Sequence, residues 1–529
     1  MSEDRMSTTL SKFIFTFTFI GVAIELLLYP SADNLCGCLM TVLSAAIFVW
    51  FGLNCDFVRD NPFSFVAYLT MFLYRFLPLF STLIEGKEIS YGMESAIKTF
   101  LLESILFIIA TIAYVESNRI KFSIGKDKPA LLKGIFDAIG LFNQPSSAAL
   151  WILGILGLSS KLVMLSMGAF SELGVLYKIL SPFNVFSYAP VMLFFPGLLN
   201  MKCEKRINFR NKGVWLYIVI LSILNLASNS RSAIIAPFAI IMLMILLECF
   251  FGTINVNEIF QPKRMVLMIL VIVIAYNTLN VVSNAILITR SVRGDVSFTE
   301  LIRLSVNSIV TSTKDGEETD EISIKSKDEV PTSYASGWTE DYIDNFILNR
   351  FANIRITDEV FYYSDKLHGD SKGLLQEDLL INLICRVIPQ PLINILGIKI
   401  DKSDYEYSRG DYIYYASGVG NVYSLGGYRV TSHLADGMAT FGILYFPIQV
   451  IVWFFIFKLL NTLTLWTSEG IIYSSFGMIN LYTFFRLFTN TYGIASDFQF
   501  LFRGFWQSAL FYACAMLIAR IIGNSSVRL

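Results

Sequence analysis

Long apolar runs alternate with short polar loops along most of this chain. A helix needs about 20 consecutive, mostly apolar residues to cross the hydrocarbon core of a bilayer, and twelve runs come close to that length. The pattern therefore predicts about twelve membrane-spanning helices. They lie near residues 12–29, 35–53, 62–84, 95–115, 146–166, 182–199, 213–229, 233–251, 264–284, 435–457, 470–488 and 504–523.

The apolar pattern is interrupted between Arg290 and Leu434, where the chain becomes polar. We call residues 290–434 the polar island. It divides the chain into a bundle of nine predicted spans at 1–289, the island itself, and three further spans at 435–529. Loops on a rigid scaffold commonly carry function, so we expect the chemistry of the protein in or beside the island.

Composition agrees with a membrane protein. The chain has 529 residues, of which 54% are hydrophobic and 16% are charged, whereas soluble domains carry about 25% charged residues. The formal net charge is −1, so no overall basic field predicts a nucleic-acid partner. The cysteines and histidines show no zinc-ligand spacing. We expect an all-α polytopic protein of the lipid bilayer, without a metal or another cofactor.

The distribution of Lys and Arg predicts the orientation of the spans. The loops 116–133 and 200–212 carry five cations each, whereas the loops 30–34, 85–93 and 167–181 carry none, one and one. Short loops that are rich in Lys and Arg usually face the cytoplasm. With twelve spans, both termini then lie in the cytoplasm and the polar island faces outward.

Several kinds of segment are predicted inside the polar island. Residues 312–332 are rich in Ser, Thr, Lys, Asp and Glu, which is typical of a flexible excursion. Apolar residues recur at helical spacing over 343–354, and Arg350 lies on that stripe, either reaching toward water or pointing into a site. The apolar segment 379–400 is broken by two prolines and predicts an interfacial or re-entrant helix. The Tyr-, Gly- and Ser-rich loop 405–428 has rings that suit sugar stacking.

Six arginines converge by topology on the predicted outer face. A guanidinium binds phosphate bidentately and keeps its charge, so such a cluster suits a polyprenyl-diphosphate headgroup. The alternatives are an interfacial anchor for Arg231 and contacts with lipid headgroups for Arg290 and Arg293. The six residues are Arg231, Arg290, Arg293, Arg409, Arg429 and Arg503.

Two further arginines lie within predicted spans, where an ionisable group is costly and indicates either function or pairing. Arg486 lies near the outer end of its span and is placed to reach an outward cavity. Arg75 lies near the middle of its span, with Glu25 and Glu103 as candidate partners.

His433 and Asp436 stand where the tenth predicted span begins. If the helix already includes both residues, their side chains share one face, and together they can orient and deprotonate a hydroxyl. The alternatives are a helix N-cap for Asp436 and a structural role for His433. His368, the other histidine of the chain, also lies in the island and is a further candidate.

Three short stretches carry a resemblance to a known family. They are the turn Asn229–Ser230–Arg231–Ser232–Ala233, the approach Gly426–Gly427–Tyr428–Arg429 with the helix start Leu434–Ala435–Asp436–Gly437–Met438–Ala439–Thr440–Phe441–Gly442, and Phe502–Arg503–Gly504 before the last span. Together with twelve spans and one large late outer loop, they resemble the bacterial O-antigen and exopolysaccharide repeat-unit polymerases, the Wzy family. That family commonly carries Glu where this chain has Asp436.

The resemblance implies a metal-independent glycosyltransferase of GT-C-like architecture in the bacterial inner membrane. A growing glycan would pass from its undecaprenyl-diphosphate carrier to the sugar end of a new lipid-linked oligosaccharide at the outer leaflet. A flippase and a chain-length regulator of the same pathway would be its partners. The implied catalytic residues are His433, Asp436 and Arg429; the implied diphosphate ligands are Arg231, Arg290, Arg293, Arg409 and Arg503; and the additional candidates are Arg350, Arg486 and His368.

Two other functions stay open at this point. An O-antigen ligase, which moves a glycan onto a different acceptor, would share the fold and the donor chemistry. A flippase or another transporter would not be an enzyme, but the chain shows no internal repeat of the kind common in secondary transporters. A flippase would also need its cations in a central cavity that opens to both sides, whereas the arginines here gather toward one face.

Overall fold

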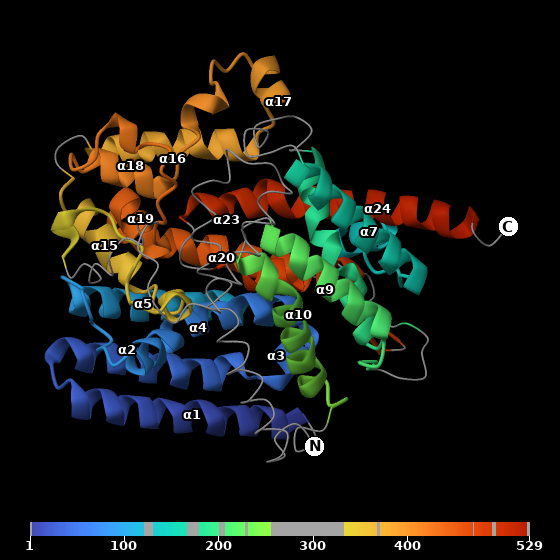
Figure 1. Ribbon diagram of the computed structural model, residues 1–529, viewed down its shortest axis with the longest axis horizontal. Coiled ribbons are helices and arrows are strands. Elements are labelled where there is room, and N and C mark those ends of the chain that lie inside the picture. The colour runs from blue at the N-terminus through green and yellow to red at the C-terminus, as the bar shows by residue number, and fades with distance from the viewer. Residues whose placement is uncertain are drawn as a thin grey trace, which may run out of the picture.

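The fold is seen in a computed structural model, which describes residues 3–120, 131–166, 179–199, 201, 207–227, 231–254, 333–367, 371–468, 470–488 and 493–525. Helices dominate these stretches (Figure 1). The predicted span at 264–284 and the predicted flexible excursion at 312–332 lie outside the described residues.

Seven helical runs among the described residues are long and apolar enough to cross a membrane. Each coincides with a predicted span, in agreement with a multi-pass helical membrane protein. They are Met6–Leu28, Ala32–Gly52, Pro62–Ile84, Ala96–Arg119, Ser147–Ser166, His433–Asn461 and Ala495–Ile522.

The remaining predicted spans within the described residues are shorter or irregular, so these residues do not confirm the count of twelve. Helix α9 covers Lys212–Ala227 and α10 covers Arg231–Phe250, and both fall short of a full span. The predicted span at 182–199 is instead a 3₁₀ helix, η3, over Ser181–Phe194. The three prolines of this stretch remove backbone N–H donors, which explains why a continuous α-helix does not form.

The prediction of one continuous helix at 470–488 is wrong. Strands β1 (Thr464–Thr467) and β2 (Gly470–Tyr473) form an antiparallel hairpin, followed by the short helices α21 (Ser475–Ile479) and α22 (Leu481–Phe485). The hairpin residues are mainly aromatic and β-branched, which favours strands. The Ser474 side chain caps α21 by accepting a hydrogen bond from the Gly477 amide.

The N-terminal helices form a compact layer, with α1 (Glu3–Leu28), α2 (Ala32–Ile47), α4 (Pro62–Ile84) and α5 (Ala96–Arg119) packed side by side (Figure 1). A π-helical segment, η1 (Phe48–Gly52), extends α2, and α3 (Cys55–Asp60) links it to α4. Within this layer Arg75 pairs with Glu103 at 2.6 Å, and both side chains are buried. Of the two predicted partners of Arg75, Glu103 is therefore the one used.

Small residues allow α7 (Ser147–Ser166) to pack closely against η3. A Cβ at Gly154 would collide with the Pro190 ring, and one at Gly157 would collide with the backbone amide of Ser187. The hydroxyl of Tyr217 on α9 lies 2.9 Å from the carbonyl oxygens of both Gly154 and Ser187. A neighbouring helix thus satisfies backbone groups of the proline-rich segment, as a membrane environment requires.

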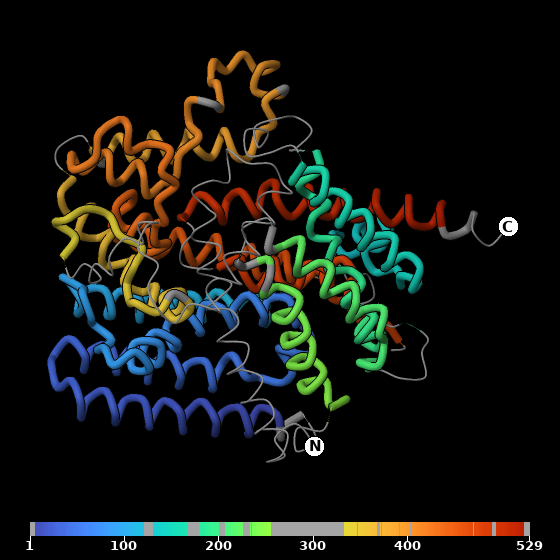
Figure 2. The backbone as a smooth tube through the Cα atoms, in the orientation of Figure 1, coloured from blue at the N-terminus to red at the C-terminus, as the bar shows by residue number. Residues whose placement is uncertain are grey.

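The described part of the polar island packs on one end of the bundle. Lys87 and Lys98, beside the ends of α4 and α5, form ion pairs with Asp344 and Asp365 of the island at 2.8 and 2.7 Å. Asp358 accepts hydrogen bonds from backbone amides of the same connection. The tube view shows the island above this end of the helices (Figure 2). The island therefore shares an end of the bundle with the cation-poor loop 85–93.

Short helices make up most of the described island, more than the sequence pattern predicted. The stripe over 343–354 is only partly helical, because α14 ends at Asn349 and a new helix starts at Arg355. The predicted loop 405–428 contains helix α18. The helices are η4 (Tyr334–Ser336), α14 (Phe346–Asn349), α15 (Arg355–Ser364), α16 (Ser371–Val387), α17 (Gln390–Ile395), η5 (Lys402–Tyr405), α18 (Arg409–Ala416) and η6 (Val422–Ser424).

The island leads into the C-terminal spans. Helix α19 (His433–Phe441) is joined by the 3₁₀ turn η7 (Gly442–Leu444) to α20 (Tyr445–Asn461). The last apolar run consists of α23 (Ala495–Gln499), the π-helical η8 (Phe500–Gly504) and α24 (Phe505–Ser525). Contacts of α16 with α19 and α23 bring the island against the starts of both runs.

Candidate functional site

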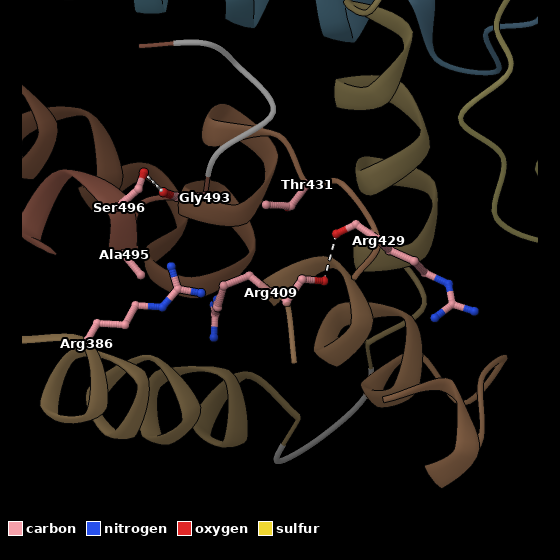
Figure 3. Close-up of a pocket in the computed structure, with 8 residues that line it drawn as sticks. Arg386, Arg409, Arg429, Thr431, Gly493, Ala495 and Ser496 are labelled. Carbon is pink, nitrogen blue, oxygen red and sulfur yellow. Dashed lines mark hydrogen bonds between the residues drawn. The ribbon is translucent and has the colours of Figure 1, made fainter. Parts of the chain in front are cut away.

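A cavity of about 100 Å³ lies where the island meets the last apolar run, and it has room for several water molecules. Its lining comes from the end of α16, the start of α18, the segment before α19 and the start of α23 (Figure 3). We call it the cationic cavity, because three arginines contribute to its wall. The lining residues are Arg386, Ser408, Arg409, Arg429, Thr431, Gly493, Ala495 and Ser496.

Arg409 is the most firmly held of these arginines. Its guanidinium is almost fully buried and forms ion pairs with Asp378 at 2.5 Å and Asp436 at 2.7 Å. It also donates to the Leu375 carbonyl at 3.0 Å and to the Thr440 hydroxyl at 2.7 Å. A guanidinium has five N–H donors, and these contacts, with the Nε bond to Asp436 at 3.0 Å, account for all five. Arg409 therefore keeps no donor for a ligand.

The charges of this cluster depend on one another. Burial disfavours the charged Arg409, but the carboxylates of Asp436 and Asp378 outweigh burial and raise the pKa of Arg409 above its ordinary value. Burial also raises the pKa of Asp378, while Arg409 and the Tyr407 hydroxyl act in the opposite direction. A cation that forms ion pairs with two buried carboxylates typically has a structural role, because neither charge is tolerated in the interior without its partner.

Arg386 is placed differently. Its side chain points into the cationic cavity toward Arg409 (Figure 3), and no hydrogen bond or ion pair to the described residues engages its guanidinium. Burial and the positive charge of Arg409 lower the pKa of Arg386 from its ordinary value, although Asp436 and Asp378 partly compensate. The cavity thus holds a cation with its hydrogen-bond donors available, which an anion would satisfy.

A buried hydroxyl completes the wall beside Arg386. Thr431 is 4% exposed, and its Oγ1 has no hydrogen-bond partner in the described structure. Ser496, also in the wall, donates to the Gly493 carbonyl at 2.6 Å (Figure 3). A buried polar atom without a partner is costly, so Thr431 adds a second unsatisfied donor to the same cavity.

Arg429 contributes its backbone to the cavity, while its guanidinium points away (Figure 3). Its carbonyl accepts a hydrogen bond from the Ser408 hydroxyl at 2.7 Å. Its guanidinium pairs with the buried Asp411 at 2.9 Å and lies 4.5 Å from the centre of the Tyr414 ring. The segments that carry Arg409 and Arg429 therefore lie close together, but the two guanidinium groups have different partners.

Two buried groups hold the backbone that carries Arg429. Asp411 accepts hydrogen bonds from the amides of Tyr428 and Arg429 at 2.8 and 3.1 Å, and Tyr428 takes a positive φ of 54°, which is uncommon outside glycine. Gly410 lies so close to this segment that a Cβ would come within 2.6 Å of the Arg429 carbonyl oxygen. Asp411 also completes a capping box with Ser408 at the start of α18.

His433 and Asp436 both lie in α19, as the sequence predicted, but they have different partners. His433 Nε2 is 2.9 Å from Asp497 and its Nδ1 is 2.8 Å from the Tyr445 hydroxyl. The N-cap of α19 is Ser432, so Asp436 is not the helix N-cap. Asp436 instead holds Arg409 and accepts the Ile494 amide at 3.1 Å. Both side chains are buried, and they form two separate networks.

Of the other predicted site residues, some lie in the described parts of the structure and some lie outside them. Arg503 donates to the Arg386 carbonyl at 2.8 Å and so fixes the end of α16 beside the cavity. Arg486 lies 5.9 Å from the Tyr482 ring in the bundle, and Arg350 is exposed on the island. The side chain of Arg231, at the first residue of α10, lies outside the described parts, as do Arg290, Arg293 and His368.

Sequence reasoning missed three residues of these networks, and for two of them a signal was present. The two are Asp378 and Arg386, which recur every four residues, with Asn382 between them, in the otherwise apolar segment 378–387. This spacing places a polar stripe on one face of α16. Asp497, the third, accepts hydrogen bonds from Gln449, Trp453 and His433, all to Oδ2. No pattern near Asp497 pointed to that convergence.

No metal centre is evident in the described stretches, where no group of three or more His, Cys, Asp or Glu residues is arranged to hold a metal ion. In comparisons with known proteins, no family model, no curated protein and no solved structure matches the chain. Its function is therefore inferred from the site and from the resemblance of its motifs.

Proposed function

We propose that this protein is an integral-membrane glycan polymerase whose cationic cavity receives the diphosphate group of a polyprenyl-linked oligosaccharide. The observation that supports this most is the Arg386 guanidinium, which faces the cavity without a partner among the described residues. Arginine binds phosphate oxygens in a fork and stays charged. The resemblance of the three sequence stretches to the Wzy polymerases supplies the reaction class.

Each cavity residue has a distinct part in this proposal. Arg386 binds the diphosphate and stabilises its developing negative charge as the anomeric carbon exchanges its bond to the diphosphate oxygen for a bond to the acceptor hydroxyl oxygen. The proton of that hydroxyl passes to the released diphosphate. Thr431 offers a hydroxyl to the same group. Arg409 does not contact the ligand; its bonds to Asp378 and Asp436 hold α16, α18 and α19 in register. Arg503 fixes the carbonyl of Arg386 and thereby the direction of that side chain.

The location of the cavity also supports the proposal. It lies at the junction of the polar island with two apolar runs, at the end of the bundle that carries the cation-poor loop 85–93. A lipid-linked substrate that keeps its chain in the bilayer would present its headgroup at such an end. Placement of the cations at one end favours a polymerase over a flippase, which needs a path through the bundle.

The test is a transfer reaction with purified protein in lipid vesicles, supplied with polyprenyl-diphosphate-linked oligosaccharide and followed by the length of the products. The parent protein is expected to give a ladder of joined units. Arg386→Gln should leave single units unjoined. Arg119→Gln is a matched control, since Arg119 is exposed and pairs with Glu116 at the other end of α5.

Other outcomes of this experiment contradict the proposal in recognisable ways. Joined units of normal length from Arg386→Gln would remove the cavity from the reaction. Movement of the lipid-linked unit across the vesicle membrane without joining would indicate a flippase. A single transfer to an unrelated acceptor, without a ladder, would indicate a ligase.

A further inference from the structure

Helix α17 of the polar island carries a cluster of exposed apolar side chains. Leu392, Ile395 and Leu396 are 50%, 78% and 63% exposed, and their spacing of three and four residues places them on one face of the helix. We call these three residues the apolar tip. An exposed apolar cluster marks a surface that meets a membrane or another molecule.

The apolar tip is held in a fixed shape. Ile393, within the same helix, is fully buried and anchors α17 to the protein. The Gln390 side chain donates to the Ile400 carbonyl at 3.2 Å, and Lys402 donates to the Ile388 carbonyl at 2.5 Å, so the two ends of the segment are tied together. In Figure 1, α17 projects from the island, apart from α15 and α18. The tip therefore points outward because the fold holds it there.

Contacts with the last apolar run place α17 near the level of the membrane surface. Arg503 donates to the Arg386 carbonyl at 2.8 Å, and Arg386 lies four residues before the start of α17. Arg503 directly precedes the predicted span 504–523, so the end of α16 is held where that span enters the bilayer. Phe502 and Trp506 of the same run are 60% and 40% exposed, and aromatic side chains are enriched at membrane–water interfaces.

We propose that the apolar tip is inserted among the acyl chains of one leaflet of the bilayer. The tip then continues the lipid-facing surface that Phe502 and Trp506 begin on the last run. Lys399 follows the tip and is exposed, so its long side chain reaches the headgroups of the same leaflet. An apolar face among acyl chains with a lysine at headgroup level is the arrangement of an interfacial anchor.

This anchor has a consequence for the cationic cavity. Arg386 lines the cavity and stands about one helical turn before α17, so insertion of the tip holds that guanidinium close to the level of the lipid headgroups. The anchor concerns the bilayer and not a glycan, and it therefore goes beyond the proposed function and does not depend on it.

The experiment places a photoreactive diazirine amino acid at position 395 of the full chain in phosphatidylcholine vesicles. After irradiation, mass spectrometry identifies the adducts. Two matched controls carry the same amino acid in place of Leu517 of α24, which is 61% exposed, and Val422 of η6 in the island, which is 64% exposed. We expect lipid adducts at position 395 to approach those at 517 and to exceed those at 422 at least about fivefold.

A second variant tests the insertion without a probe at position 395. Ile395→Asn with Leu396→Asn changes two exposed side chains, so the protein should fold as the parent does. With the diazirine amino acid in place of Leu392, this double variant should give about fivefold fewer lipid adducts than the same probe in the parent.

Three results would overturn the proposal. The first is lipid labelling at position 395 no stronger than at 422, and the second is unchanged labelling in the double variant. The third is a product that joins two copies of the chain through position 395, which would assign the tip to a second copy. No glycan is used, so these results are separate from the polymer assay with Arg386→Gln.

Discussion

Replacement of Arg409 by methionine tests whether this arginine has a structural role, as the shared counter-charge of Asp378 and Asp436. Methionine has a comparable length and no charge, so Arg409→Met removes the cation while filling much of its space. The change leaves the carboxylates of Asp378 and Asp436 buried without their shared partner; their side chains are 2% and 0% exposed. Removing one member of a buried ion pair costs about 3–5 kcal/mol, and we expect a loss in this range.

The assay is equilibrium or thermal unfolding of the purified protein in a fixed detergent. The triple variant Arg409→Met, Asp378→Asn, Asp436→Asn should recover most of the loss, because the unpaired charges are then absent and residues in one network do not act additively. Arg386→Gln is the comparison variant. It has no partner in the described residues to orphan, so it should change stability by less than about 1 kcal/mol.

The dependence on pH gives an independent check of Arg409→Met. Burial already raises the pKa of Asp378, and loss of the cation raises it further, so this carboxyl binds a proton more readily in the folded state than in the unfolded chain. The penalty should therefore shrink as the pH is lowered from 7 to 5. Two results would contradict the structural role of Arg409: an unfolding free energy of Arg409→Met within about 1 kcal/mol of the parent's at pH 7, or a triple variant no more stable than the single one.

Three further variants test the surrounding networks in the same unfolding assay. Glu359→Gln removes a carboxyl whose pKa is raised from 4.5 to about 8. Because the folded parent binds this proton more tightly than the unfolded chain, the parent loses stability as the pH rises from 4.5 to 8, so the variant should be up to roughly 3 kcal/mol more stable than the parent at pH 7 and equally stable at pH 4. The same difference in unfolding free energy at both pH values would contradict this. His433→Ala takes one of three donors from the buried Asp497 and should cost about 1–3 kcal/mol; no loss would mean that His433 is not part of that network. Gly410→Ala forces a Cβ to within 2.6 Å of the Arg429 carbonyl oxygen and should cost about 1–3 kcal/mol; a neutral effect would show that this segment yields easily.

Most of the spans are predictable from sequence because the signal is long. Helices such as Pro62–Ile84 and Ala96–Arg119 contain enough consecutive apolar residues that few alternatives exist. The partner of Arg75 was narrowed to two carboxylates for a similar reason, since a cation at that depth needs a counter-charge. The segment 470–488 fails the same logic. It is apolar on average, but its first residues pair locally as a hairpin, and an average does not separate a strand from a helix.

The site was harder to predict because its arginines look alike in sequence. Arg409 and Arg386 are both polar residues in a polar island, yet one uses all five donors within the protein and the other uses none that the described residues accept. That difference depends on where Asp378 and Asp436 lie in space. His433 was likewise expected to act with Asp436, but its side chain contacts Asp497, which is 64 residues away in the chain.

The binding of undecaprenyl diphosphate to the purified protein tests the central claim most directly, because it requires neither the acceptor nor the correct sugar. Native mass spectrometry or a competition assay can compare the parent, Arg386→Gln and the control Arg119→Gln at one ionic strength. The account predicts that Arg386→Gln binds at least about tenfold more weakly, the effect of roughly 1.4 kcal/mol, while Arg119→Gln binds as the parent does. Equal affinity of all three proteins would contradict the assignment of the cationic cavity.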